Sequence, residues 1–328
     1  MLISLGARGL LSSYPVSFGT FFKHLPTVNV STLKFNLGPA GKTTLKLFST
    51  STNAAASAAL ETPHFRTLTC DQKYQIRLYV DALLQWNQKM NLTAVREENE
   101  VMERHVEDSL AIIDPVRDSY LSHCGSSFEK LSVVDVGSGA GLPGLVLAIA
   151  CPSWNVTLLE SMNKRCVFLE HVVGLIGLQN VKVLRGRAEY FEHDICDGHL
   201  GAYYPSQAVG NTPQILIKRQ NLGQNLDFRE GFDIAVARAV AEMRVLAEYC
   251  LPLVRVGGLF VAAKGHDPQE EVTKAERAIH LMGASLLQTC FVESHSKYGQ
   301  RTAIMCVKDG PTPRKYPRAP GTPAKLPM

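Results

Sequence analysis

From residue 71 onward, apolar positions recur at the spacing of amphipathic helices. The first stripe consists of Ile76, Tyr79, Val80, Leu83, Trp86 and Met90. The second consists of Val101, His105, Val106, Leu110 and Ile113. Steps of three and four residues place one apolar face along each helix. We expect the first helix to end at Asn91-Leu92-Thr93 and the second to stop at Asp114-Pro115, which predicts a helical segment over residues 61–125.

Beyond residue 130, short apolar runs alternate with helix-like stretches. The expected strands are 131–136, 156–160, 181–184, 232–237, 259–263, 286–292 and 302–307. The expected helices among them are 142–150, 164–175, 240–250 and 269–282. Strands that alternate with helices form a parallel sheet covered on both faces, and the last two strands resemble a closing hairpin. The pattern therefore predicts an α/β fold: a mainly parallel seven-stranded sheet with helices on both faces and an antiparallel last strand, preceded by the helical segment.

Two stretches depart from this pattern. Residues 193–230 are rich in Gly, Asn and Gln where a short connection would suffice, so we expect an inserted loop at about 194–228. The tail, residues 311–328, contains six prolines and four bases but no acid. Prolines exclude the centre of a helix or sheet, and the bases could either bind RNA phosphates or be solvated. The α/β domain is therefore expected over residues 126–310.

The charge of the chain is unevenly distributed. Residues 1–60 contain five bases, 15 Ser or Thr and no acid, so the other residues carry 29 bases against 30 acids. The net charge of +4 is therefore no sign of a nucleic-acid partner. An acid-free, hydroxyl-rich beginning predicts a disordered transit peptide over 1–60, with an untargeted tail as the alternative. Because Arg8 is the only arginine among the five bases, we expect a chloroplast location, with the mitochondrion as the alternative.

Composition also excludes some classes of protein. The longest apolar run is Leu145–Cys151, which is too short to cross a bilayer, so we expect no membrane partner. The eight cysteines are scattered, with no C-x-x-C pair, and there is no H-E-x-x-H. These absences predict reduced, mostly buried thiols and no metal site.

The strongest chemical signal is a glycine-rich loop after the first expected strand. It reads Asp135-Val136-Gly137-Ser138-Gly139-Ala140-Gly141-Leu142-Pro143-Gly144. Such a loop lies at the carboxyl end of its strand, where open α/β sheets bind ligands. The spacing from Gly139 fits a dinucleotide, whereas Asp135-x-Gly137-x-Gly139-x-Gly141 also matches S-adenosylmethionine-dependent methyltransferases. We expect the second cofactor, because the Asp135 carboxylate could engage a cationic amino-acid end and would repel a pyrophosphate.

The ends of later strands add further candidates. Glu160 ends the second strand, where a carboxylate can accept hydrogen bonds from both ribose hydroxyls of either cofactor. Residues 185–189 follow the third strand, where a class I methyltransferase would contact adenine. The fourth strand is followed neither by an Asn/Asp-Pro-Pro-Tyr/Phe motif nor by a Pro-Cys dipeptide. These absences argue against amino-group and cytosine C5 methyltransferases.

The chain resembles the bacterial small-subunit ribosomal RNA guanine-N7 methyltransferases, the methyltransferase G or glucose-inhibited division protein B family. In addition to the glycine loop, the resemblance is carried by Trp86-Asn87, Asn91-Leu92-Thr93, Arg104-His105, Asp108-Ser109, Leu159-Glu160-Ser161, Lys164-Arg165, Phe168-Leu169, Ala237-Arg238-Ala239, Lys264-Gly265, Tyr316-Pro317-Arg318 and Pro320-Gly321-Thr322-Pro323. It covers roughly residues 71–327. Residues 1–60 and the loop around 194–228 depart from the family pattern, and the first departure suits a plant organelle form.

The resemblance implies a class I methyltransferase (Rossmann-like) fold, S-adenosylmethionine as cofactor and small-subunit ribosomal RNA, or the ribosomal subunit, as partner. The residues that it implies for cofactor binding are Gly137, Leu142, Ala188, Glu189 and Arg238, with Gly139 from the same loop and Glu160 by the general class I pattern. The implied reaction is methylation of a guanine N7, and we expect a monomer.

Few catalytic groups are expected for this reaction. Guanine N7 carries an in-plane lone pair, so no general base must remove a proton before attack. A buried cation beside N7 would oppose the developing positive charge, so we expect Arg238 to serve the cofactor carboxylate or a neighbouring acid. Asn91, Arg104, His105 and Asp108 are candidates for the substrate site, with a packing role as the alternative. A nicotinamide-dependent oxidoreductase and a non-catalytic ribosome-assembly factor on the same fold remain rival functions.

Overall fold

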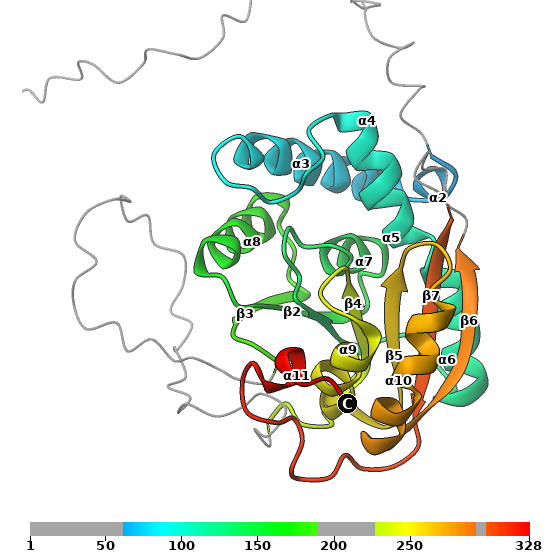
Figure 1. Ribbon diagram of the computed structural model, residues 1–328. Coiled ribbons are helices and arrows are strands. Elements are labelled where there is room, and N and C mark those ends of the chain that lie inside the picture. The colour runs from blue at the N-terminus through cyan, green and yellow to red at the C-terminus, as the bar shows by residue number, and fades with distance from the viewer. Residues whose placement is uncertain (1–61, 189–226, 293–299) are drawn as a thin grey trace, which may run out of the picture. The chain divides into compact units, whose positions relative to one another are not determined.

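The computed structural model describes residues 62–188, 227–292 and 300–328 (Figure 1). The leader expected over 1–60, nearly all of the inserted loop expected at about 194–228, and Glu189 lie outside these residues. The described residues belong to one unit of the chain, which spans Thr52–Met328.

A seven-stranded sheet lies at the centre of this unit. Its strands are β1 Ser132–Val136, β2 Asn155–Glu160, β3 Val181–Arg185, β4 Phe232–Arg238, β5 Val254–Lys264, β6 Ala284–Val292 and β7 Arg301–Lys308. Their order in the sheet is β3-β2-β1-β4-β5-β7-β6. Strands β1 to β5 pair in parallel, whereas β7 is antiparallel to both β5 and β6. The predicted mainly parallel sheet with an antiparallel last strand is confirmed.

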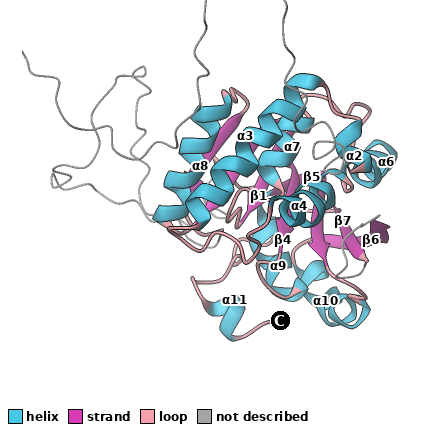
Figure 2. Cartoon of the chain, turned by 90° about the horizontal axis from the view of Figure 1, so that it is seen from above, coloured by secondary structure: helices cyan, strands magenta, loops and turns pink. Residues whose placement is uncertain are grey.

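Side chains that alternate along the strands form two apolar cores, one on each face of the sheet. In β1, Val133 belongs to one core and Val134 to the other, and Ile234 and Ala235 of β4 divide in the same way. The first core is covered by α3 Cys70–Asn87, α6 Ile113–His123, α7 Gly144–Ala150 and α8 Asn163–Ile176, and the second by α9 Met243–Cys250 and α10 Gln269–Leu281 (Figure 2). Because both faces are buried, ligands can approach this sheet only at the strand ends.

The helical segment differs from its predicted form after residue 97. Its elements are α2 Pro63–Arg66, α3, α4 Glu98–Val101, a π-helix over Met102–Glu107, α5 Asp108–Leu110 and α6. The predicted stop at Asp114-Pro115 is wrong, because α6 begins at Ile113 and continues through both residues. Pro115 lies in the first turn, where a helix has no use for the backbone N–H that proline lacks. The π-helix was not predicted, and it carries Arg104 and His105.

The tail packs against the second core. Thr312 and Tyr316 are buried, and a short helix, α11, spans Thr322–Lys325. The guanidinium of Arg318 donates to both carboxylate oxygens of Glu248 on α9, with 3.0 Å between Nε and Oε1 and 2.7 Å between Nη2 and Oε2, and Glu248 is fully buried. This corrects the expectation that all four tail bases are solvated or bind RNA, because Arg318 neutralises a buried carboxylate. The other three bases of the tail are exposed.

Candidate functional site

A cavity of about 330 Å³ lies at the carboxyl ends of β1, β2 and β4, and we call it the loop cavity. Five of the predicted cofactor residues line it together: Gly137, Gly139, Leu142, Glu160 and Arg238. A smaller cavity of about 230 Å³ shares Gly137, Ser161 and Val240 with it and is lined by Ala188. The described residues predicted to contact adenine therefore lie next to Glu160, which is predicted to contact the ribose. The remaining candidate, Glu189, lies outside the described residues.

The glycine loop uses backbone conformations that side chains disfavour. Gly137, Gly139 and Gly141 have φ values of +75°, +58° and +91°, in the left-handed region that glycine adopts without a Cβ penalty. A Cβ on Gly137 would also lie 2.7 Å from Cγ2 of Val240. Beyond the adjacent residues, a Cβ on Gly139 would have the Gly137 carbonyl oxygen, at 3.8 Å, as its nearest neighbour. The loop is thus packed at Gly137 and open for a ligand at Gly139.

Glu160 ties this loop to the end of β2. Its Oε2 accepts a hydrogen bond from the backbone N–H of Gly139 at 2.9 Å, and its Oε1 accepts one from that of Met162 at 2.8 Å. The side chain is only 3% exposed, yet it lines the loop cavity. A carboxylate has lone pairs for further donors, so Glu160 can hold the loop and accept hydroxyl groups of a ligand at once.

The helical segment supports the same loop from α3. The hydroxyl of Tyr79 donates to the carbonyl oxygen of Ala140 at 2.8 Å, and Tyr79 is fully buried. Burial raises the pKa of Tyr79, so the hydroxyl remains a donor at physiological pH. The helical segment is therefore a structural part of the site.

Asp135 lies near the end of β1 with its side chain turned towards α7. It is fully buried, and its Oδ2 accepts a hydrogen bond from the backbone N–H of Gly144, at the start of α7, at 3.0 Å. Burial raises the pKa of Asp135 to about 6. Among the described residues, it is not one that lines the loop cavity. Oδ2 therefore stabilises a helix start, whereas Oδ1 has no hydrogen-bond partner among the described residues. A contact between Asp135 and the cationic end of a ligand stays a prediction.

Arg238 places a cation at the end of β4. Its hydrogen bonds to the chain are long: Nη1 lies 3.5 Å from the carbonyl oxygen of His105 and 3.5 Å from Oγ of Ser109. Charge-assisted hydrogen bonds are usually shorter. Burial lowers the pKa of Arg238, although nearby acidic groups, among them Asp108 and Asp135, oppose the shift. A half-buried guanidinium held this loosely is suited to an anionic ligand.

His105 lies beside that cation. Its Nε2 is 2.8 Å from Oγ1 of Thr93, and its Nδ1 is 3.5 Å from Nη2 of Arg238. Burial, and then the charge of Arg238, lower the pKa of His105 to about 3. From the sequence, His105 could be either a packing residue of the core or a residue of the substrate site. The structure places a neutral imidazole in the cavity wall, bonded to the loop that carries Thr93.

This imidazole should make the stability of the protein depend on pH. Because the pKa of His105 is lower in the folded state than in the unfolded chain, only the unfolded chain gains a proton as the pH falls below about 6.5. The wild type should therefore lose about 1.4 kcal/mol, relative to His105→Gln, between pH 7.5 and pH 5.5. Urea unfolding of both proteins at the two pH values measures this difference. A difference that stays constant with pH would contradict a neutral His105 in the cavity wall.

A second cavity of about 300 Å³ adjoins the first, and we call it the side cavity. The two cavities share His105, Arg238 and Ala239. Arg104 and Asp108 also line the side cavity. Three of the four predicted substrate residues therefore gather beside the predicted cofactor residues, at the wall that the two cavities share.

These side chains are held by partners that the sequence did not suggest. Arg104 donates through Nη1 to Glu100 at 2.9 Å, and Asp108 accepts from Nε of Arg301, on β7, at 2.8 Å. Asn91, the fourth predicted residue, is exposed and is not among the described residues that line either cavity.

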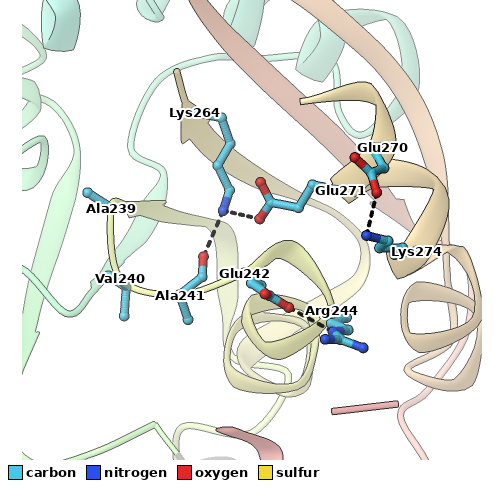
Figure 3. A pocket seen from close by; sticks show the side chains of 9 residues that line it. All are labelled: Ala239, Val240, Ala241, Glu242, Arg244, Lys264, Glu270, Glu271 and Lys274. Atoms are coloured by element: carbon cyan, nitrogen blue, oxygen red, sulfur yellow. Dashed lines mark hydrogen bonds and ion pairs between the residues drawn. The ribbon is translucent and has the colours of Figure 1, made fainter. Parts of the chain in front are cut away.

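A third cavity, of about 500 Å³, lies beside residues 239–242, and Figure 3 shows its lining side chains. Lys264 Nζ donates to the carbonyl oxygen of Ala241 at 2.7 Å and to Glu271 at 2.5 Å. Glu271 also accepts from the backbone N–H of Met243. These bonds hold the turn after β4, which carries Val240 against the glycine loop. The Lys264-Gly265 pair of the sequence thus shapes the loop cavity from outside.

We expect Glu271→Gln to loosen this turn. An amide cannot replace the ionic hydrogen bond to Lys264, so the free energy of unfolding should fall by about 1–2 kcal/mol, and the affinity for the loop-cavity ligand should fall several-fold. The matched control is Glu270→Gln. The adjacent Glu270 side chain is 84% exposed and pairs only across one helical turn with Lys274 (Figure 3), and such pairs contribute little. Equal effects of the two substitutions, measured by urea unfolding and calorimetry, would contradict a role for Glu271 in the turn.

Sequence reasoning missed several residues of the site. Thr93 belongs to the recognised Asn91-Leu92-Thr93 motif, so the motif was a usable signal for the loop-cavity wall. Tyr79 was assigned only to an apolar helix stripe, because nothing in that stripe distinguishes a hydroxyl that reaches the glycine loop.

Other features of the described residues bear on chemistry. All seven described cysteines are free. Only Cys166, Cys250 and Cys306 are buried, so the expectation of mostly buried thiols is wrong for the described residues. Within the described ranges, no three His, Cys, Asp or Glu side chains gather as a metal ion would require. No helix in these ranges has the length and apolar character needed to span a membrane.

Comparison with known proteins gives a consistent result. The family described as "GidB: rRNA small subunit methyltransferase G" matches residues 72–199 and 210–301. The chain is 38% identical over 258 residues to the ribosomal RNA small subunit methyltransferase G of Alkaliphilus metalliredigens, covering 79% of this chain and 91% of that protein. It is 36% identical over 265 residues to the protein of the same name from Staphylococcus aureus strain Newman, covering 81% and 94%. The chain therefore belongs to the rRNA small subunit methyltransferase G (GidB) family.

Proposed function

We propose that this protein transfers a methyl group from S-adenosylmethionine to N7 of a guanine in small-subunit ribosomal RNA. The observation that carries the proposal is the pair of adjoining cavities at the carboxyl ends of β1 and β4, in a chain of this family. One cavity is lined by the residues that suit the cofactor, and the other lies next to it across a shared wall.

The loop cavity fits S-adenosylmethionine, which supplies an activated methyl group when bound. The glycine loop leaves open space at Gly139, where a nucleoside could approach the backbone. Glu160 would accept the ribose hydroxyls, and Ala188 lies in the adjoining cavity where adenine would sit. Arg238 would bind the carboxylate of the amino-acid end, because it is a half-buried cation with long contacts to its own chain.

The reaction requires alignment more than acid–base chemistry. The N7 lone pair is available without removal of a proton, so no general base is needed. Holding the nucleophile in line with the methyl group can supply on the order of 7–11 kcal/mol in favourable cases. The neutral His105 in the shared wall agrees with this chemistry, because its lowered pKa keeps a second cation away from the base.

Arg238→Ala tests the assignment of the cofactor carboxylate. Loss of a hydrogen bond to a charged group costs about 1.5–3 kcal/mol. The dissociation constant for S-adenosylhomocysteine should therefore rise by a factor of about ten or more. Isothermal titration calorimetry measures it. Adenosine lacks the carboxylate and should bind the wild type and the variant with equal affinity. Unchanged affinity for S-adenosylhomocysteine would reject this role of Arg238.

Two rival functions are less well supported. A nicotinamide-dependent oxidoreductase was suggested by the glycine spacing from Gly139, but the chain belongs to a methyltransferase family. A non-catalytic assembly factor would have no need for the hydrogen bond between Glu160 and the glycine loop, or for an Arg238 with only long hydrogen bonds to its own chain. Both features instead suit a protein that binds its cofactor.

The cellular setting is also part of the proposal. We propose that residues 1–60 are a transit peptide that directs the protein to the chloroplast, where it modifies organelle small-subunit ribosomal RNA as a monomer. The acid-free, hydroxyl-rich composition of these residues supports import. A fluorescent fusion of residues 1–60 that accumulates in mitochondria or the cytosol would reject the chloroplast assignment.

The decisive experiment locates the transferred methyl group. Purified protein is incubated with labelled S-adenosylmethionine and small ribosomal subunits or their RNA, and 7-methylguanosine is mapped by chemical cleavage. A transcript with 7-deazaguanosine at the mapped position should accept no methyl group, because it lacks N7. Absence of transfer to either form of the RNA, or label on another atom, would overturn the proposal.

A further inference from the structure

The side cavity contains a buried hydroxyl group whose hydrogen bonds are unmade. Thr302, on β7, is 1% exposed, and its Oγ1 has no hydrogen-bond partner among the described residues. A buried polar group without a partner costs about 1–3 kcal/mol, and native proteins rarely leave one without a reason. Because Thr302 lines the side cavity, this hydroxyl indicates a polar ligand there.

The sheet places Thr302 on the far side of the cavity from the glycine loop. Arg238 of β4 is in register with Ala263 of β5, and Lys264 of β5 is in register with Thr302 of β7. The shared wall at Arg238 and the wall at Thr302 are thus two strands apart, which is roughly 10 Å. A purine whose N7 lies at the shared wall can span that distance with a hydrogen bond at its opposite, Watson–Crick edge.

The remaining walls suit a base that has been turned out of an RNA helix. Ile112, Ala263 and Val292 contribute apolar surface, as expected for a pocket that receives a flipped base. Asp108 is the only carboxylate among the described residues that line the cavity, and it is 7% exposed. Arg301 holds it in place through the 2.8 Å hydrogen bond to Oδ2.

We propose that the side cavity holds the target guanine and that Asp108 identifies it by accepting hydrogen bonds from its N1–H and 2-amino groups. An ionised carboxylate only accepts hydrogen bonds, and the Watson–Crick edge of guanine offers two adjacent donors. Adenine has an acceptor at N1 and no 2-amino group, so it would face Asp108 with a lone pair. The proposal rests on the proposed function, since it assigns the recognition of its substrate.

The same contact favours the chemical step. In the transfer, the C–S bond breaks as the bond from N7 to the methyl carbon forms, the sulfur becomes neutral, and the purine gains one positive charge while no proton leaves. That charge makes N1–H a stronger donor, so its hydrogen bond to Asp108 strengthens in the transition state. Asp108 would therefore affect the rate as well as the choice of base.

The test compares guanosine with inosine, which lacks the 2-amino group. Small-subunit RNA is ligated with either nucleoside at the mapped position and reconstituted into subunits, and single-turnover methyl transfer is measured. We expect inosine to slow the wild type roughly tenfold, and Asp108→Asn to slow guanosine transfer roughly ten- to a hundredfold. In Asp108→Asn the penalty for inosine should largely disappear, while the affinity for S-adenosylhomocysteine remains that of the wild type.

The controls separate recognition from folding and from the proposed function. Asp114→Asn makes the same substitution at an exposed residue of α6 and should retain the inosine penalty. Thr302→Val removes the unpaired hydroxyl without changing the side-chain shape and should slow transfer without destabilising the protein, which serves as the second variant if Asp108→Asn fails to fold. An inosine penalty of equal size in the wild type and Asp108→Asn would overturn the inference. A wild type that methylates no guanine would instead reject the proposed function.

Discussion

Glu160→Gln should weaken the binding of S-adenosylmethionine roughly 30- to 1000-fold. Both carboxylate oxygens accept backbone hydrogen bonds, from Gly139 at 2.9 Å and from Met162 at 2.8 Å. A glutamine has one oxygen and one NH₂ group, so it must present a donor to one of these two donors. The unpaired N–H costs about 1–3 kcal/mol, and the ribose hydroxyls lose hydrogen bonds to a charged acceptor, which are about twice as strong as neutral ones. A combined loss of about 2–4 kcal/mol corresponds to that range of affinity.

Calorimetry with S-adenosylhomocysteine measures this effect. Calorimetry with adenosine distinguishes a contact with the ribose from a contact with the amino-acid end. Adenosine retains the ribose, so Glu160→Gln should weaken it as strongly, in contrast to Arg238→Ala. Glu170→Gln is the matched control, because Glu170 is an exposed residue of α8, the helix that follows Glu160. A Glu160→Gln protein that binds the cofactor like the wild type would show that the carboxylate neither holds the loop nor contacts the ribose.

The fold could be predicted from the sequence because its signals are local. The short apolar runs of the strands and the glycine loop are readable in single segments, and the two cores, which bury both faces of the sheet, confirm the strands. The π-helix over Met102–Glu107 has no comparable signal, because the apolar residues in and beside it, at 101, 106 and 110, were interpreted as the stripe of an ordinary α-helix. Pro115 was interpreted as a stop, yet the same residue suits a first helical turn. Only the packing of the chain decides whether Pro115 follows the end of one helix or lies in the first turn of the next.

The site was less predictable because it depends on partners distant in the sequence. The glycine loop and Glu160 follow their strands directly, so their meeting at one edge of the sheet could be expected. Asp135 lies in the same motif, but its carboxylate turns inward to Gly144, and a motif does not state which way a side chain faces. Arg301 lies 193 positions from Asp108, its partner. Such pairs are set by the order of strands, which a single sequence does not reveal.

Arg318→Ala should lower the free energy of unfolding by about 3 kcal/mol. Its guanidinium is the charged partner of Glu248, whose carboxylate is fully buried beneath the tail. Removing one partner of a buried ion pair leaves an uncompensated charge and costs about 3–5 kcal/mol. The lower figure applies here because Arg318 is 26% exposed and its backbone N–H, which alanine retains, also donates to Glu248. Urea unfolding monitored by circular dichroism measures the loss.

A double substitution separates the buried charge from the packing of the tail. In Arg318→Ala with Glu248→Gln, the buried carboxylate is gone, and the glutamine oxygen can still accept from the backbone N–H of residue 318. The double variant should therefore be more stable than Arg318→Ala alone, whereas independent effects would make it less stable. Lys325→Ala, at an exposed residue of the same tail, should change the stability by no more than about 0.5 kcal/mol. The contrary outcome is an Arg318→Ala protein that is as stable as Lys325→Ala but binds ribosomal RNA more weakly and with a flatter salt dependence. In that case Arg318 would belong to an RNA-binding surface, and its ion pair with Glu248 would contribute nothing to the stability of the fold.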